Sequence, residues 1–511
     1  METGAIIVLF CFIVGTAILG AIPGLRYRLS AENWAVGDRS FGRWLNWFVM
    51  AGEVYTAFAF LGASGWAYAK GGPTFYILGY GALGYMVGYH ILPRICVYGH
   101  RHQLVTQGDL VEYLYDSRPL GILMSCIGVA FLLPYLQLQL TALGLIVEVS
   151  SFGAVDRVTA MLIAFAMVAV FVFLSGLRGV ASTAVIKDVL MGGAMLFFGI
   201  YFPYHYAGSI GDLVSQIEAI KPGYMLFPGG TPTLDVSWAM TTFVVMAAGF
   251  YMWPHFTTNT FSAKDPDVPR HNAVWLPVCH LFFIFPMLIG FTAILVYLDH
   301  PLPTADMAFL SLVKDTFPAW VLGIVGGAGA LACMIPAADL LLSTSLLISR
   351  NIYVKGFRHG EKVSPEHVQK VARYLILVLT AAALYLSIFH AKLLVNLLLT
   401  GYSGVTQFFP IIVLGLFWKQ ASRLASVCGL VTGEALVFYL MLHGLDPLPV
   451  GSWHLNAGFV ALCANTVVFV AVSLVTSTGK ARVECGEGGM ETIEAAVKPE
   501  TAPAQPAEGE S

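Results

Sequence analysis

The sequence predicts an all-α integral membrane protein with about thirteen transmembrane helices. The chain has 511 residues, of which 57% are hydrophobic and only 11% are charged. A soluble domain carries roughly 25% charged residues, because its surface faces water on all sides. The shortage of charge therefore excludes a soluble enzyme. The net charge of −3 provides no basic surface, so a nucleic-acid partner is not predicted.

Thirteen apolar segments are long enough to cross a bilayer as helices, which takes about 20 residues. The first lacks both a basic region before it and a small-residue cleavage site after it, so we interpret it as a retained span. Residues 481–511 are rich in Ala, Glu, Gly and Pro, which predicts a disordered tail after a transmembrane domain at 1–480. The predicted spans are 5–25, 44–69, 74–95, 119–148, 157–176, 180–206, 236–258, 273–297, 318–348, 371–389, 393–417, 424–443 and 455–477.

The loops between these spans differ in charge. Most of the 27 Lys and Arg residues fall in alternate loops, with the largest group between residues 350 and 373. Because Lys and Arg favour the cytoplasmic side of a membrane, the N-terminus is predicted outside and the C-terminal tail in the cytoplasm.

Four ionisable residues stand out inside predicted spans: Glu53, Lys187, Asp188 and Asp339. A charge there costs at least a few kcal/mol unless it has a partner or a function. Glu53 follows Gly52 in a span of small residues, where we expect the helix to open. Broken helices expose N–H and C=O groups that hold ions in secondary transporters. Glu53 is therefore a candidate for ion coupling, and a bond to a neighbouring helix is the alternative.

The other ionisable residues are interpreted in the same way. Lys187 and Asp188 are adjacent and point about 100° apart around a helix, so they are not expected to neutralise each other. Lys187 then needs another anion, or its stem extends to the inner surface. Asp339 follows Pro336, which removes a backbone donor and is expected to kink the span. The alternative for Asp339 is a hydrogen bond to a serine or tyrosine.

Motifs for other chemistry do not occur in the sequence. There is no GxxxxGK[ST] loop, HExxH motif or dinucleotide fingerprint, so neither an enzyme nor a cofactor is predicted. The eight cysteines are scattered singly without a CxxC spacing, which predicts neither a disulfide framework nor a metal site. Pro254 and His255 lie near a span end and favour a structural kink. Gradient-driven transport is the function that these observations favour.

The chain resembles the sodium:solute symporter family up to about residue 480. Within that family it is most similar to bacterial monocarboxylate uptake permeases, through GEVYTA at 52–57, PYLQLQ at 134–139 and IPAA at 335–338. The resemblance implies a LeuT-like fold of two inverted five-helix repeats, at about 44–206 and 236–417, with substrate and ion at breaks in the second and seventh spans. The family motifs are WxxGxRxFGxWxxW at 34–47, SGLRGVASTAVIKD at 175–188, SRNIY at 349–353 and QFFPxxxLGLFWKQASRxAS at 407–426.

The sequence departs from the family at its sodium site. The resemblance implies that two hydroxyls of the ninth span join backbone carbonyls of the second, but the family register places Ile335 and Pro336 at those positions. Neither offers an oxygen to a hard cation, which takes about six oxygen ligands. In the sixth span the register places Ala184 at an acid position and Lys187 at a glutamine position.

We therefore expect the Lys187 ammonium to occupy the sodium region as a cation that loads and unloads a proton. Glu53 or Asp339 would be its partner. Sodium coupling through Glu53, Thr56 and Asp339 is the alternative.

The resemblance implies a short-chain monocarboxylate as substrate, such as lactate, pyruvate, acetate or propionate. A carboxylate suits the positive end of a broken helix. Another solute (proline, pantothenate or a sugar) and a transporter-like metabolite sensor are the alternatives. A bacterial inner membrane is the expected location, and no obligate protein partner is evident. The candidate substrate-binding residues are Tyr55, Thr56, Tyr135, Gln137 and Gln407.

Overall fold

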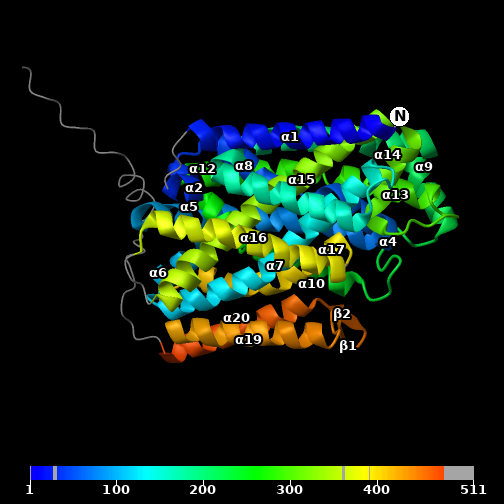
Figure 1. Cartoon of the computed structure of the whole chain (residues 1–511). Coiled ribbons are helices and arrows are strands. Elements are labelled where there is room, and N and C mark those ends of the chain that lie inside the picture. The colour runs from blue at the N-terminus through cyan, green and yellow to red at the C-terminus, as the bar shows by residue number, and fades with distance from the viewer. Residues whose placement is uncertain (1, 27–30, 359–362, 391, 477–511) are drawn as a thin grey trace, which may run out of the picture.

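The computed structural model describes residues 2–26, 31–358, 363–390 and 392–476. The predicted tail at 481–511 lies outside these residues. Apart from loops and an isolated β-bridge between Phe41 and Ala263, the described residues form helices and one antiparallel hairpin of β1 (Leu448–Val450) and β2 (Trp453–Leu455). The helices run side by side as a bundle (Figure 1).

The helices that occupy the predicted spans follow the order of the sequence, and several spans are divided into shorter helices. They are α1 (Glu2–Arg26), α3 (Arg43–Gly52), α4 (Ala63–Lys70), α5 (Tyr76–His102), α7 (Arg118–Ser150), α8 (Arg157–Ala207), α10 (Val236–Gly249), α11 (Pro254–Phe261), α12 (Asp267–Leu281), α13 (Ile284–Val296), α15 (Ala319–Leu346), α16 (Pro365–Phe389), α17 (Leu394–Val405), α18 (Gly415–Phe417), α19 (Arg423–Leu442) and α20 (Ala457–Thr476). Among the described residues, nine helical segments are both long and apolar enough to span a membrane. The multi-pass helical architecture is confirmed, and the count of thirteen spans stays a prediction.

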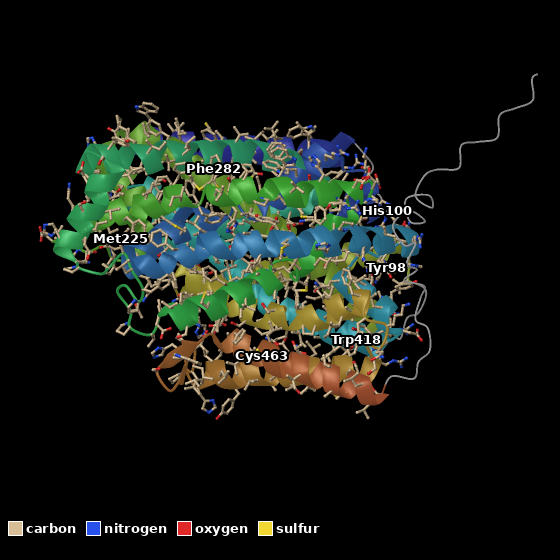
Figure 2. All side chains as sticks on the ribbon, turned by 180° about the vertical axis from the view of Figure 1, so that it is seen from behind. Tyr98, His100, Met225, Phe282, Trp418 and Cys463 are labelled. Carbon is tan, nitrogen blue, oxygen red and sulfur yellow. The ribbon has the colours of Figure 1, made fainter. Side chains whose placement is uncertain are left out.

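Short helices mark the two ends of the bundle. One end carries α9 (Ile210–Ile220), α14 (Ala308–Thr316) and the β1–β2 hairpin, and we call it the α14 end. The other end carries α2 (Ala31–Val36) and α6 (Gln107–Tyr115), and we call it the α6 end. Figure 2, which labels Met225 and His100 at opposite ends, shows the same division from behind.

Two predicted spans, 157–176 and 180–206, join within α8. The helical backbone is interrupted at Gly176 alone, where φ is 57°. A side chain is strained in that conformation, and glycine adopts it freely. A Cβ at this position would also stand 2.7 Å from the Trp34 ring. The predicted loop is therefore replaced by a turn at one glycine.

The second and seventh spans are broken, as predicted. The second ends its first half at Gly52, passes through irregular residues 53–57, and resumes in a π-helical turn, η2 (Phe58–Gly62), that leads into α4. The seventh is interrupted between Gly249 and Pro254. Pro254 opens α11 at little cost, because the first turn of a helix has no partner for its N–H groups.

The SRNIY motif lies in η5 (Leu347–Phe357), a π-helical segment that directly follows α15. Its residues connect η5 to α6. Asp109 caps the first turn of α6 and lies 2.5 Å from Lys355 Nζ and 2.7 Å from Arg350 Nε. Burial raises the pKa of Asp109, but Arg350 and Lys355 outweigh it and hold the pKa below its usual range. Arg350 of the motif and Lys355 just after it therefore form a partly buried ion-pair network with Asp109 at the α6 end.

Candidate functional site

Lys187 of α8 reaches the break in the second span. Its Nζ donates to the carbonyl oxygens of Gly52, at 2.6 Å, and Tyr55, at 2.9 Å. Gly52 ends α3, so its carbonyl lacks a partner within the helix. That carbonyl also lies at the negative end of the helix dipole, which stabilises a cation. The ammonium is fully buried at this point.

Asp188 corrects one sequence-based expectation. The two adjacent side chains were expected to point apart, yet Lys187 Nζ lies 3.0 Å from Asp188 Oδ1. The angle around the helix describes only the Cα–Cβ bonds, and the four-carbon stem of lysine bends across it. Lys187 therefore has its anion beside it in sequence, and its stem does not extend to the surface.

Glu53 and Asp339 lie close enough beside the break in the second span for their carboxyl groups to interact. Asn259 of α11 donates to Asp339 Oδ2 at 2.6 Å. His255 Nε2 lies 3.3 Å from Glu53 Oε2, so the second half of the seventh span, α11, contributes two side chains to this polar cluster.

His255 and Asn259 are the site residues that sequence reasoning missed. His255 was interpreted as part of a structural kink near a span end. The signal was available in their spacing, since residues four apart share one face of a helix. That face of α11 meets the carboxyls of Glu53 and Asp339.

A small cavity of about 20 Å³ lies next to Glu53. It has room for about one water molecule, so side chains must move before an organic solute enters. Among its described lining residues, Glu53 is the single carboxyl and no Lys or Arg occurs. The lining comprises Glu53, Val54, Thr56, Phe58, Tyr80, Tyr135, Phe250, Trp253, Phe256, Leu398 and Tyr402.

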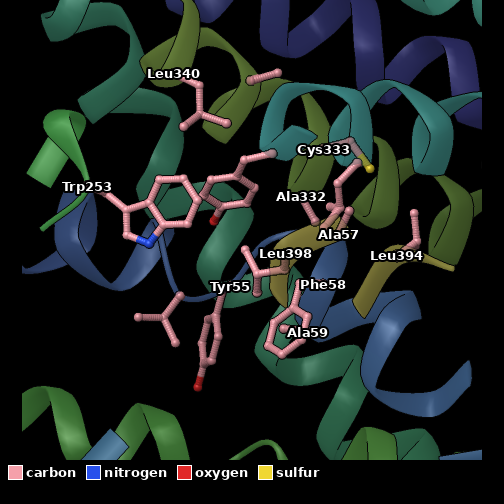
Figure 3. Packing of buried hydrophobic residues seen from close by; sticks show 14 of the residues in the cluster. Tyr55, Ala57, Phe58, Ala59, Trp253, Ala332, Cys333, Leu340, Leu394 and Leu398 are labelled. Atoms are coloured by element: carbon pink, nitrogen blue, oxygen red, sulfur yellow. The ribbon is translucent and has the colours of Figure 1, made fainter. Parts of the chain in front are cut away.

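The five candidate substrate-binding residues divide into two groups. Thr56 and Tyr135 line the cavity, and the Tyr135 hydroxyl donates to the Glu53 carbonyl at 3.3 Å. The Tyr55 ring extends away from Trp253 (Figure 3), and its hydroxyl donates to the Cys279 carbonyl.

The two glutamines also lie outside the cavity lining. Gln137 donates to the carbonyls of Leu386 and His390 and holds the end of α16. Gln407 donates to Gly458 in α20 and accepts from Asn465. Gln139 lies two residues after Gln137 and therefore on another face of α7. Its side-chain oxygen accepts a hydrogen bond from the Ala57 amide in the broken span at 3.3 Å. Sequence spacing separates these faces but does not show which one meets the cavity.

The described residues contain no group of three His, Cys, Asp or Glu side chains that could hold a metal ion. At the break in the second span, the carbonyl oxygens of Gly52 and Tyr55 accept hydrogen bonds from an ammonium group.

Comparison with known proteins agrees with this architecture. A model of the sodium:solute symporter family matches residues 34–433. The chain is 37% identical over 487 residues to YhjB, an uncharacterized symporter of Bacillus subtilis, covering 93% of this chain and 98% of the relative. It is 27% identical over 493 residues to a monocarboxylate transport permease protein of Rhizobium johnstonii, covering 92% and 96%.

Solved structures share the fold at low identity. A Na⁺-coupled sialic acid symporter in a substrate-bound outward-open state matches with a TM-score of 0.76 and 17% identity, covering 94% of this chain and 99% of that one. MhsT in complex with L-phenylalanine matches with a TM-score of 0.52 and 14% identity, covering 84% and 98%. Family and fold are those of transporters, and the LeuT-like architecture is shown. The chain therefore belongs to the sodium:solute symporter family, with the fold of a cation-coupled symporter of small molecules.

Proposed function

We propose that this protein is a proton-coupled symporter that takes up short-chain monocarboxylates. The observation that carries the proposal is the position of Lys187 Nζ on the carbonyls of Gly52 and Tyr55. A fixed ammonium there supplies the positive charge that a sodium ion would bring. A mobile proton then takes the place of mobile sodium as the coupling ion.

The proton has two places to bind in this cluster. One is the pair of Lys187 and Asp188, and the other is the pair of Glu53 and Asp339. Buried lysines and paired carboxyls are groups whose protonation changes with small changes in their surroundings. Rocking of the bundle around the broken spans would provide such changes, by exposing the cluster to each side in turn.

The proposed substrate class rests on the similarity to the Rhizobium permease and on the cavity. Seven aromatic rings in the lining suit a small apolar body. With no Lys or Arg among the described lining residues, the carboxylate of a substrate would depend on hydrogen-bond donors. Tyr80, Tyr135 and Tyr402 supply hydroxyls, and a protonated Glu53 supplies a further O–H. Binding of the acid and of the proton would then favour each other.

Sodium coupling is the alternative, favoured by the family and by the sodium-coupled neighbour. The side-chain oxygens of Glu53, Thr56 and Asp339 are the groups available for it. For orientation, we propose that the α6 end faces the cytoplasm of a bacterial cell, because the basic loops gather there.

The test is uptake of labelled lactate into proteoliposomes under an imposed proton or sodium gradient, with acetate, propionate, pyruvate and proline as competitors. The wild type is expected to follow the proton gradient without sodium. Lys187→Gln is expected to lose this dependence, whereas Lys264→Gln, at an exposed lysine, keeps it. Uptake that requires sodium, and that survives Lys187→Gln at every pH, would contradict proton coupling. Preferential inhibition by proline would contradict the substrate class.

A further inference from the structure

Asp306 is a buried carboxyl at the α14 end, far from the cluster of the broken spans. It lies in η4 (Ala305–Met307), the turn that precedes α14, and is only 4% exposed. Its Oδ2 accepts the backbone N–H of Leu394 at 3.1 Å, and Leu394 is the first residue of α17. Its Oδ1 is buried without a hydrogen-bond partner. A carboxyl of one segment thus caps a helix that begins 88 residues later.

The same carboxyl also packs closely against α4, the second half of the broken second span. A Cβ at Gly65 of α4 would stand 2.7 Å from Asp306 Oδ1 and 2.8 Å from its Cα, so only glycine allows this approach. Next to it, Trp66 Nε1 donates to Asn396 Oδ1 at 3.3 Å. The segments η4, α4 and α17 therefore meet at one carboxyl.

This junction lies on the path between the cavity and the α14 end. Phe58 of η2 and Leu398 of α17 both line the cavity and lie close together in Figure 3. One turn nearer the α14 end, a Cβ at Gly62 would stand 3.3 Å from Val395 and 3.4 Å from Leu394. Contact of η2 and α4 with α17 closes the cavity on this side, so opening it requires these segments to separate.

The charges around Asp306 are few. Arg157, at the start of α8, is the cation that acts on it. Lys70, at the end of α4, donates instead to Thr231, and Lys314 of α14 lies over the Phe152 ring. Burial raises the pKa of Asp306 to about 7, against the opposing effects of the Leu394 hydrogen bond and of Arg157.

We infer that Asp306 is a proton-binding site whose occupancy is linked to closure of the α14 end. When α4 and α17 close on η4, the carboxyl is buried and takes up a proton. When they separate, the carboxyl meets water and releases it. The raised pKa belongs to the closed state, so closure is favoured as the pH falls and weakens as the pH rises through about 7. The pH dependence ends below about pH 4, where the carboxyl is protonated in both states and closure is favoured most.

The inference is tested without any substrate, by electron spin distance measurements on the full chain in nanodiscs. Spin labels are attached at Lys392→Cys, before α17, and at Ile220→Cys, in α9, in a variant with the native cysteines replaced. Both positions are exposed. The ratio of open to closed distances is expected to rise with pH between about 5 and 7, by at most tenfold per pH unit for one proton.

Asp306→Asn is expected to remove this pH dependence, because the amide keeps the shape and does not titrate. Asp299→Asn, at an exposed carboxyl of the same end, serves as the control and should leave it unchanged. A wild-type distance distribution that is the same from pH 5 to pH 8 would overturn the inference, as would an unaltered pH dependence in Asp306→Asn. Asp306→Asn leaves Lys187 and its partners in place, and the uptake test with Lys187→Gln leaves Asp306 in place, so this inference and the proposed function can fail separately.

Discussion

The Nζ of Lys187 in α8 lies 2.6 Å from the carbonyl oxygen of Gly52, the last residue of α3. This hydrogen bond joins two helices at the point where one of them is broken. The ammonium also bonds Tyr55 on the other side of the break, so one side chain spans the opening that the irregular backbone creates.

Gly52→Ala is expected to disturb this contact directly. A Cβ at Gly52 would stand 3.0 Å from Lys187 Nζ and 3.7 Å from the Ala184 methyl, so the ammonium must withdraw from the carbonyl. Loss of a charged hydrogen bond of about 1.5–3 kcal/mol predicts a fall of roughly 10- to 100-fold in the initial rate of uptake. Gly193→Ala in α8, where a Cβ has nothing within 4 Å, is the control, and equal rates in both variants would contradict the prediction.

Asp188→Asn is expected to lower the stability of the protein. Both partners of the Lys187–Asp188 pair are buried, and removal of one leaves an uncompensated charge at a cost of about 3–5 kcal/mol. The double variant Lys187→Gln/Asp188→Asn should recover most of that loss, because no charge then remains. Thermal unfolding in detergent measures both. If the effects of the two single variants simply add, the pair is not coupled.

Trp253→Ala is expected to change selectivity rather than abolish transport. The Trp253 ring lines the cavity, packs against Tyr135 with ring centroids 5.0 Å apart, and contacts Tyr402 edge to face. Its removal enlarges a space that now holds about one water molecule, so longer acids should compete better against lactate. Trp275→Ala, at a residue that is 55% exposed, is the control. A competition profile unchanged by Trp253→Ala would place the substrate elsewhere.

Asp109→Asn is expected to destabilise the α6 end in a pH-dependent manner. Its pKa is held below the usual range in the folded protein, so the stabilisation is complete above about pH 4 and is lost as the pH falls toward the lowered pKa. The difference in melting temperature between wild type and variant should therefore be constant from pH 5 to pH 7 and shrink below pH 4. Asp116→Asn, at a fully exposed carboxyl, should show no such difference.

The parts of the site that depend on residues close together in the sequence could be predicted. Gly52 next to Glu53 indicated the break in the second span, and the family register placed Lys187 opposite its carbonyls. The pairing with Asp188 could not be predicted from helix geometry alone, because a long flexible stem is free to cross the angle that separates two Cβ atoms.

Residues on facing helices were harder to predict. Gln137 and Gln407 are predicted to bind substrate, yet both donate to backbone carbonyls of other helices. A polar side chain inside a membrane can make its hydrogen bonds either to a neighbouring helix or to groups that line a cavity. Only the packing of the helices distinguishes these two roles. That packing depends on contacts between residues that lie far apart in the sequence.

The bonds of Gln407 have a mechanical consequence for α19 and α20. These two helices pack against each other along one side of the bundle (Figure 1). Gln407, just after α17, is tied to α20 through Gly458 and Asn465. A tilt of α17 during the transport cycle would therefore move α19 and α20 with it. These two helices would then belong to the moving part of the transporter and not to a fixed support around it.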